Sequence, residues 1–313
     1  MLSRTAEDLF WLARYMERAE NTARLLDVGL RMANLSPEAE SDTVEWHSTV
    51  VAAGCETTFY ARYETPTAQT VLEHLACDQS NPSSIVSCLQ TARANSRAVR
   101  TALSADMWEA VNTTWLDLRS VCPEPPTPEK ARRFLEWVKE RSILFGGAYA
   151  NTMLRNDAYW FVRLGTFLER ADNTARILDV KYHVLLPEHE SIGGARDYYQ
   201  WAAILRSVSA LRAYHWVYRD RLQPWLIADL LLLRPEMPRS LRSCFDEVTL
   251  RLDALAGAYA DRGECHRLAG QMHSTLRYGR IEQIFQDGLH EFLQGFLREN
   301  AALGQEIAVK YLT

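Results

Sequence analysis

The same polar phrase occurs twice in this chain, as YMERAENTARLLDV over residues 15–28 and as FLERADNTARILDV over residues 167–180. Ten of the twelve residues in 17–28 are identical to those in 169–180. Further matches keep nearly the same offset: Trp46 with Trp201, and PSSIVSCL (82–89) with PRSLRSCF (238–245). We interpret the chain as a tandem duplication of a unit of about 155 residues, with residues 1–150 as the first helical repeat and 151–313 as the second. Two copies are too few for an open solenoid, so we expect one globular bundle with pseudo-two-fold symmetry.

Apolar residues recur with a helical rather than an alternating period along almost the whole chain. In the first segment, six of them fall within about 40° of one line at 100° per residue: Leu12, Met16, Ala19, Ala23, Leu26 and Leu30. Helix starts are predicted at Asn81-Pro82, Ser104, Thr127-Pro128 and Pro238. The fold class is therefore predicted to be all α, a helical bundle.

Composition excludes several classes of function. The net charge is −5 without a lysine- or arginine-rich block, which argues against nucleic acid or an anionic membrane as partner. The N-terminal segment carries charges within every apolar stretch, so we expect neither a signal peptide nor a membrane anchor. Six scattered cysteines without a C-x-x-C pair predict reduced thiols rather than a disulfide framework or a zinc site. These features together predict a cytoplasmic protein.

The repeated phrase places small and polar residues side by side. The alanine pairs Ala19/Ala23 and Ala171/Ala175 have the i, i+4 spacing that lets two helices approach closely. Beside them lies a polar set that we predict to be a buried network: Glu17, Asn21, Arg24, Glu169, Asn173 and Arg176. We expect each glutamate and arginine to pair with its opposite number across the axis, or with its i+7 neighbour through a shared network. The alternative is a pair of carboxylates lining a pocket for acid–base work.

A metal site is disfavoured by the same sequence. Carboxylate-bridged di-metal bundles use Glu-x-x-His pairs, and the nearest approach here is Asp287-x-x-His290. No nucleotide-binding loop or nucleophile motif occurs either. We therefore predict no cofactor and assign no catalytic residue.

A second candidate site is basic. Three arginines have i, i+4, i+7 spacing, which places them on one helix face: Arg93, Arg97 and Arg100. Arginine clusters suit carboxylate or phosphate recognition or a protein partner, whereas the alternative is a solvated face paired with acids such as Glu109. The second repeat has Thr249, Asp253 and Ala256 at the matching positions. This asymmetry favours a binding role.

Four blocks in order resemble the alpha-E family, an all-helical bacterial domain: LFWLARYMERAENTARLLDV, NPSSIVSCLQTARANSRAVRTALSADMWEAVN, GGAYANTMLRNDAYWFVRLGTFLERADNTARILDV and MPRSLRSCF. The resemblance covers nearly the whole chain. One departure is Ala94, where relatives usually have an acidic residue. If that carboxylate belongs to a site, the site is altered in this chain.

The resemblance implies a context rather than a mechanism. Alpha-E proteins are typically encoded beside, or fused with, a circularly permuted ATP-grasp ligase, often with a transglutaminase-like peptidase, in sets that resemble peptide-forming or peptide-tagging systems. One hypothesis is therefore a non-catalytic subunit that binds a separate ATP-grasp amide ligase and helps hold its amino-acid or peptide substrate. The alternative is a stand-alone enzyme that uses Glu17 and Glu169 as acid–base groups and the arginine cluster to hold an anionic substrate. The missing nucleotide and nucleophile motifs favour the first.

Overall fold

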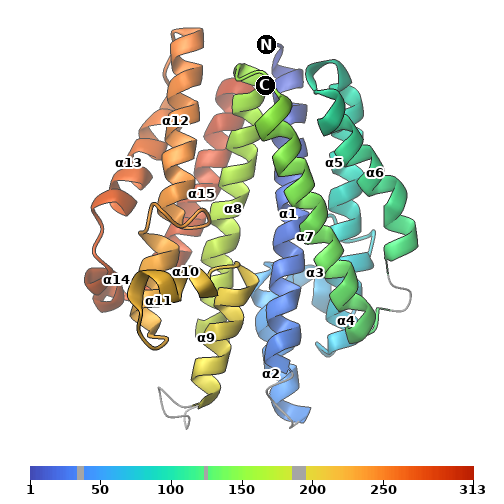
Figure 1. The fold of residues 1–313 in the computed structure, drawn as a ribbon, viewed down its shortest axis with the longest axis vertical. Coiled ribbons are helices and arrows are strands. Elements are labelled where there is room, and N and C mark those ends of the chain that lie inside the picture. The colour runs from blue at the N-terminus through green and yellow to red at the C-terminus, as the bar shows by residue number, and fades with distance from the viewer. Residues whose placement is uncertain (34–38, 123–125, 185–194) are drawn as a thin grey trace.

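A computed structural model of the chain describes residues 1–33, 39–122, 126–184 and 195–313. These residues form fifteen α-helices, a π-helical turn η1 (Glu73–Cys77), a 3-10 turn η2 (Arg100–Ala102) and no strand, which confirms the all-α prediction (Figure 1). The helices are α1 (Ser3–Ala33), α2 (Ala39–Ala52), α3 (Glu56–Tyr60), α4 (Ala68–Leu72), α5 (Ile85–Ala98), α6 (Ala105–Val121), α7 (Pro128–Thr152), α8 (Asp157–Val184), α9 (Ala195–Ser207), α10 (Leu211–Tyr218), α11 (Pro224–Leu232), α12 (Leu241–Tyr259), α13 (Glu264–Tyr278), α14 (Ile281–Asp287) and α15 (Leu289–Tyr311).

Two long helices, α1 and α8, lie side by side through the centre of the bundle (Figure 1). They run parallel, because contacts join their starts and also their middles. The amino group of Met1 lies 3.2 Å from Asp157 Oδ2, and Arg18 Nε lies 2.5 Å from Glu169 Oε1. The partners in each contact are separated by nearly the repeat offset. The two copies of the repeated phrase therefore face each other.

Small residues allow α1 and α8 to approach closely. The four alanines predicted at this crossing are each at most 1% exposed: Ala19, Ala23, Ala171 and Ala175. A Cβ added to Gly165 of α8 would lie 2.2 Å from the carbonyl oxygen of Phe10 in α1. Backbone thus lies directly against backbone here. The predicted packing of the two alanine-bearing helices on each other is confirmed, and Gly165 makes its close approach at Phe10 and Ala13.

The helix α1 is buried on several faces, as its sequence predicts. The six residues of the predicted apolar line are all at most 3% exposed, and Phe10, Leu25 and Val28 on its other sides are at most 4% exposed. Neighbouring helices cover these sides, with α5 and α7 against α1 on one flank. Charged residues on α1 consequently lie inside the bundle, where they need partners.

Two of the four predicted helix starts lie at the predicted residues. Ser104 caps α6 by accepting a hydrogen bond from the Met107 amide, and Pro128 is the first residue of α7. The other two starts lie slightly later than predicted, because Ser84 and Ser240 are the caps of α5 and α12. This explains why the matching blocks PSSIVSCL and PRSLRSCF keep a serine there.

The remaining helices interlock around the central pair. Helices α5 and α7 contact α1, and α12 and α15 contact α8. Helix α2, which follows α1, also contacts α8, and α9, which follows α8, also contacts α1. Segments from each half of the chain therefore pack against the central helix of the other half. The division into repeats 1–150 and 151–313 stays a prediction.

Candidate functional site

The centre of the bundle holds ion pairs exchanged between α1 and α8. Glu17 of α1 accepts two hydrogen bonds from Arg170 of α8, from Nε to Oε1 at 2.9 Å and from Nη2 to Oε2 at 2.8 Å. Glu169 of α8 accepts the corresponding bonds from Nε and Nη2 of Arg18, at 2.5 Å and 3.1 Å. In each helix the glutamate is followed directly in sequence by the arginine that binds the glutamate of the other helix. We call these four residues the Glu–Arg clamp.

Each clamp glutamate has a second arginine that is not duplicated. Arg14 Nε donates to Glu169 Oε2 at 2.7 Å, and Arg239 Nη1 donates to Glu17 Oε1 at 3.2 Å. The matching positions in the predicted repeats, 166 and 83, are a threonine and a serine. Glu169 thus receives its second arginine from α1, whereas Glu17 receives its second arginine from the segment before α12.

Arg239, which directly precedes the cap of α12, also connects Glu17 to Glu20. Its Nη2 donates to Glu20 Oε1. Glu20 further accepts from Arg24 Nε at 2.7 Å and from the hydroxyl of Ser142 at 2.5 Å. Glu20, Arg24 and Arg239 are 2%, 6% and 8% exposed. The first half of the network is therefore a closed, water-poor cluster.

This cluster carries an excess of positive charge. Two carboxylates, of Glu17 and Glu20, face three guanidinium groups: Arg24, Arg170 and Arg239. Burial, together with the neighbouring arginines, lowers the pKa of Arg239, which nevertheless remains a cation at neutral pH. Its hydrogen bonds to both carboxylates offset the cost of burying it.

The network carboxylates are held ionised. Burial alone would raise the pKa of Glu20, but Arg239, Arg24 and Arg170 outweigh it and lower the pKa to about 2. Burial is likewise outweighed at Glu169, where Arg14 and Arg18 lower the pKa to about 2. A general acid or base works best with a pKa near the operating pH. These two carboxylates are thus suited to structure and not to proton transfer at neutral pH.

Five of the six predicted network residues are buried, but the side chain of Arg176 is 34% exposed. The cross-axis partners assigned to Arg24 and Arg176 are wrong. Each arginine pairs with the carboxylate four residues earlier on its own helix, Glu20 and Asp172 respectively. Residues at i and i+4 lie on the same helix face, so these pairs form locally. The alternative of a shared network does describe the first repeat, because Arg239 joins Glu17 to Glu20 and hence to Arg24.

The two predicted asparagines differ. Asn21 Nδ2 donates to the carbonyl oxygen of Glu169 at 3.1 Å, adding a further link between α1 and α8. Asn173 is 5% exposed, and its Nδ2 has no hydrogen-bond acceptor among the residues that the structure describes. Asn173 therefore does not make the reciprocal bond to match the one from Asn21, unlike the residues of the Glu–Arg clamp.

Four arginines complete the clamp glutamates without having been among the predicted network residues: Arg14, Arg18, Arg170 and Arg239. A signal existed for Arg18 and Arg170, because the Glu-Arg dipeptide is identical in both copies of the phrase. Arg14 and Arg239 have no counterpart in the other repeat. Their role depends on how distant helices meet, which no local pattern reports.

The predicted arginine face lies at the surface, beside α6. Arg93 Nε donates to Asn112 Oδ1 at 3.2 Å. The guanidinium group of Arg100 lies 4.9 Å from the ring centroid of Trp108. Arg97 is exposed. Among the described residues, no carboxylate forms an ion pair with any of these three arginines, so the suggested pairing with acids such as Glu109 is not observed.

The prediction that all three arginines share one helix face is wrong for Arg100. Helix α5 ends at Ala98, because Val99 leaves the helical conformation with φ −113° and ψ 24°. Arg100 then lies in η2. It lines a groove of about 520 Å³ with Leu103, Ser104, Ala105, Trp108, Glu109 and Asn112. We call Arg93, Arg97, Arg100 and this groove the α5–α6 face.

Two further properties bear on function. The described residues contain no group of three or more His, Cys, Asp or Glu side chains placed to hold a metal ion. Within the same ranges, no helix combines the length and apolar character needed to cross a membrane.

Comparison with known proteins identifies one family. The Alpha-E family model, described as a predicted alpha-helical domain with a conserved ER motif, matches residues 1–312. Uncharacterized proteins of Mycobacterium bovis and of two Mycobacterium tuberculosis strains are each 23% identical to the chain over 317 aligned positions that cover 94% of it. The chain spans only 35% of the length of these relatives. No solved structure matches.

Proposed function

This chain belongs to the Alpha-E family, and on that basis we propose that it is a non-catalytic helical subunit of an ATP-grasp amide-ligase system. In this proposal it binds a separate ligase subunit and helps hold an amino-acid or peptide substrate. The observation that carries the proposal is a contrast between two sets of charges. The buried glutamates are neutralised by arginines, whereas the arginines of the α5–α6 face have no carboxylate partner among the described residues.

The α5–α6 face has the chemistry needed to bind an acidic partner or substrate. Asn112 holds the Nε of Arg93, and the ring of Trp108 lies beside Arg100, so both arginines are partly ordered before a ligand arrives. Ordering in advance reduces the entropy lost on binding. Arg97 between them is exposed and adds a third set of donors. Guanidinium groups bind carboxylates and phosphates through paired hydrogen bonds.

We further propose that the scaffold is a tandem duplication with a pseudo-two-fold axis parallel to α1 and α8. The reciprocal Glu–Arg clamp supports this, because an exchange of identical dipeptides is what a two-fold relation between the helices would produce. The contacts of α2 with α8 and of α9 with α1 support it too, because each helix packs on the central helix of the other half. In this view, the ER motif named in the family description fixes the register of the two central helices. Superposing residues 5–150 on 157–311 tests the idea, and unrelated topologies would refute it.

The alternative of a stand-alone enzyme has less support. It needs Glu17 and Glu169 to exchange protons with a substrate, yet each accepts hydrogen bonds from two arginines inside the bundle. Glu169 is 5% exposed, and its pKa is lowered to about 2. A substrate would have to break these ion pairs to reach either carboxylate.

Binding measurements with the ligase test the proposed role. We expect an ATP-grasp ligase encoded beside the gene to bind the purified chain, and Arg97→Ala to weaken that binding by about tenfold, with a smaller loss at high salt. Arg119→Ala removes another exposed arginine, from α6, and serves as the control. The proposal fails if the ligase does not bind, or if both variants bind as well as the wild-type chain.

ATP turnover separates the two hypotheses. The subunit proposal predicts no ATP hydrolysis by the purified chain alone. Turnover that scales with protein concentration and disappears in Glu17→Gln would instead favour the stand-alone enzyme. Circular dichroism of the variant is required beside this assay, since Glu17 is also a structural residue.

A further inference from the structure

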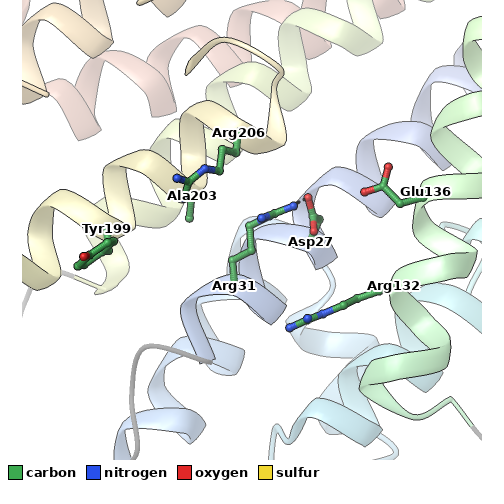
Figure 2. Close-up of a pocket in the computed structure, with 7 residues that line it drawn as sticks. All are labelled: Asp27, Arg31, Arg132, Glu136, Tyr199, Ala203 and Arg206. Atoms are coloured by element: carbon green, nitrogen blue, oxygen red, sulfur yellow. Dashed lines mark hydrogen bonds and ion pairs between the residues drawn. The ribbon is translucent and has the colours of Figure 1, made fainter. Parts of the chain in front are cut away.

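A second groove lies between α1, α7 and α9 (Figure 2). It has a volume of about 470 Å³. Seven residues line it: Asp27 and Arg31 from α1, Arg132 and Glu136 from α7, and Tyr199, Ala203 and Arg206 from α9. It shares no helix with the α5–α6 face, so the two sites are separate.

The carboxylates of this groove are already neutralised. Asp27 is 7% exposed and accepts a hydrogen bond from Arg31 Nε at 3.1 Å, drawn in Figure 2. Lys139 Nζ lies 3.6 Å from Asp27 Oδ2 and 2.6 Å from Glu136 Oε1. Two cations thus balance two anions within the wall. This part of the groove has no charge left to recruit an ammonium group.

Two arginines are left over. Arg132 projects from α7 and Arg206 from α9, on opposite walls of the groove (Figure 2). Both are exposed, and neither forms an ion pair with a described residue. With the local ion pairs balanced, the groove keeps an excess of two positive charges. A concave site with one sign of charge concentrates ligands of the opposite sign.

The lining also offers contact surface for the apolar part of an organic ligand. Tyr199 is 50% exposed and Ala203 is buried, and both lie on the same helix as Arg206. Inorganic phosphate would make no use of an aromatic ring. Small-molecule sites commonly measure about 300–1,000 Å³, so the groove suits a ligand of amino-acid or short-peptide size.

We propose that this groove is a binding site for a small organic carboxylate, such as the C-terminus of a short peptide. Arg132 and Arg206 hold the carboxylate from two walls, and Tyr199 covers the apolar part of the ligand. Asp27, Arg31 and Lys139 keep α1 and α7 in place beneath it. The site is independent of the α5–α6 face and of any ligase partner.

Calorimetric titration of the full-length chain tests the proposal. The probes are N-acetyl-alanyl-alanine with a free C-terminal carboxylate, the same dipeptide as its C-terminal amide, and inorganic phosphate. We expect the free acid to bind and the amide to bind about tenfold more weakly. Equal binding of acid and amide would overturn the proposal. Binding of phosphate without binding of the acid would overturn the choice of a carboxylate.

Matched variants locate the site. Arg206→Gln and Arg132→Gln should each reduce affinity for the acid by about tenfold. Arg133→Gln makes the same charge change at the next exposed position of α7 and should leave binding unchanged. All three positions are exposed, so the variants should fold, and far-ultraviolet circular dichroism checks this. An equal loss in Arg133→Gln would overturn the assignment to the groove.

The two sites can be told apart by crossing the experiments. Arg97→Ala should retain acid binding in the groove, and Arg206→Gln should retain binding of the ligase. If the ligase never binds but the acid does, the proposed function fails and the groove remains. If the ligase binds but no variant changes acid binding, only the groove proposal fails.

Discussion

The Glu–Arg clamp makes a strong prediction about stability. Glu169→Gln removes the negative charge that Arg14 and Arg18 share, while the amide that replaces it keeps nearly the same volume. Glu169 is 5% exposed, and the side chains of Arg14 and Arg18 are 17% and 24% exposed, so water replaces the lost counter-ion only in part. Breaking a buried ion pair from one side costs about 3–5 kcal/mol. That is a large part of the roughly 5–15 kcal/mol that stabilises a typical folded domain.

The chain provides its own control for this variant. A third Glu-Arg dipeptide, Glu140-Arg141, occurs in α7, and Glu140 is exposed. Glu140→Gln makes the same chemical change in the same dipeptide without stranding a buried cation. It should therefore alter stability by at most about 0.5 kcal/mol. The comparison isolates burial and partners from the chemistry of the substitution.

Urea titration followed by circular dichroism at 222 nm measures the difference. We expect Glu169→Gln to unfold at distinctly lower urea with an unchanged slope, and to melt about 10 °C below the wild-type chain. Reversing the pair in the double variant Arg18→Glu/Glu169→Arg should recover part of the loss, because the exchanged charges can still meet. The clamp would not be a stabilising element if Glu169→Gln and Glu140→Gln behaved alike.

Three further predictions follow from the described contacts. Glu20 and Glu169 have folded-state pKa values of about 2, below the ordinary value of 4.5, so their ionised forms stabilise the fold above about pH 5. This stabilisation is lost as the pH falls toward 2. An acid titration of the far-ultraviolet circular dichroism signal should therefore show unfolding between pH 5 and pH 2, and an unchanged signal down to pH 2 would contradict the prediction. Ala23 is fully buried in α1, so Ala23→Leu should overpack its surroundings and cost about 1–3 kcal/mol, whereas an unchanged melting temperature would argue against close packing there. The sulfur atoms of Cys77 and Cys122 lie 3.4 Å apart, so hydrogen peroxide should join them with loss of two titratable thiols, and a full count of six after treatment would refute this.

The sequence predicted the features that depend on local pattern. The helical period, the apolar line on α1 and the burial of its alanines follow from side chains that lie three or four positions apart. The start of α6 at Ser104 follows from capping chemistry in the same way. Ser84 was missed in favour of Asn81-Pro82, because Asn81 instead uses its side chain to hold the carbonyl oxygen of His74. Several residues offered plausible caps, and tertiary contacts decided among them.

Partners within the polar network could not be predicted in the same way. A duplicated phrase shows that its polar residues serve two equivalent places, but it does not say which guanidinium group reaches which carboxylate. Rotation of about 100° per residue separates Arg18 from Glu17, so the clamp forms only because α1 and α8 run parallel and in register. Arg239 reaches the cluster from the residue before the cap of α12, and the residue 156 positions earlier is a serine. The same central motif is therefore completed by Arg239, from the segment before α12, on one side and by Arg14 of α1 on the other, while each side holds two carboxylates and three arginines. A scaffold that duplicated for packing alone needs no such difference, so the asymmetry marks the halves as having specialised after the duplication that we propose.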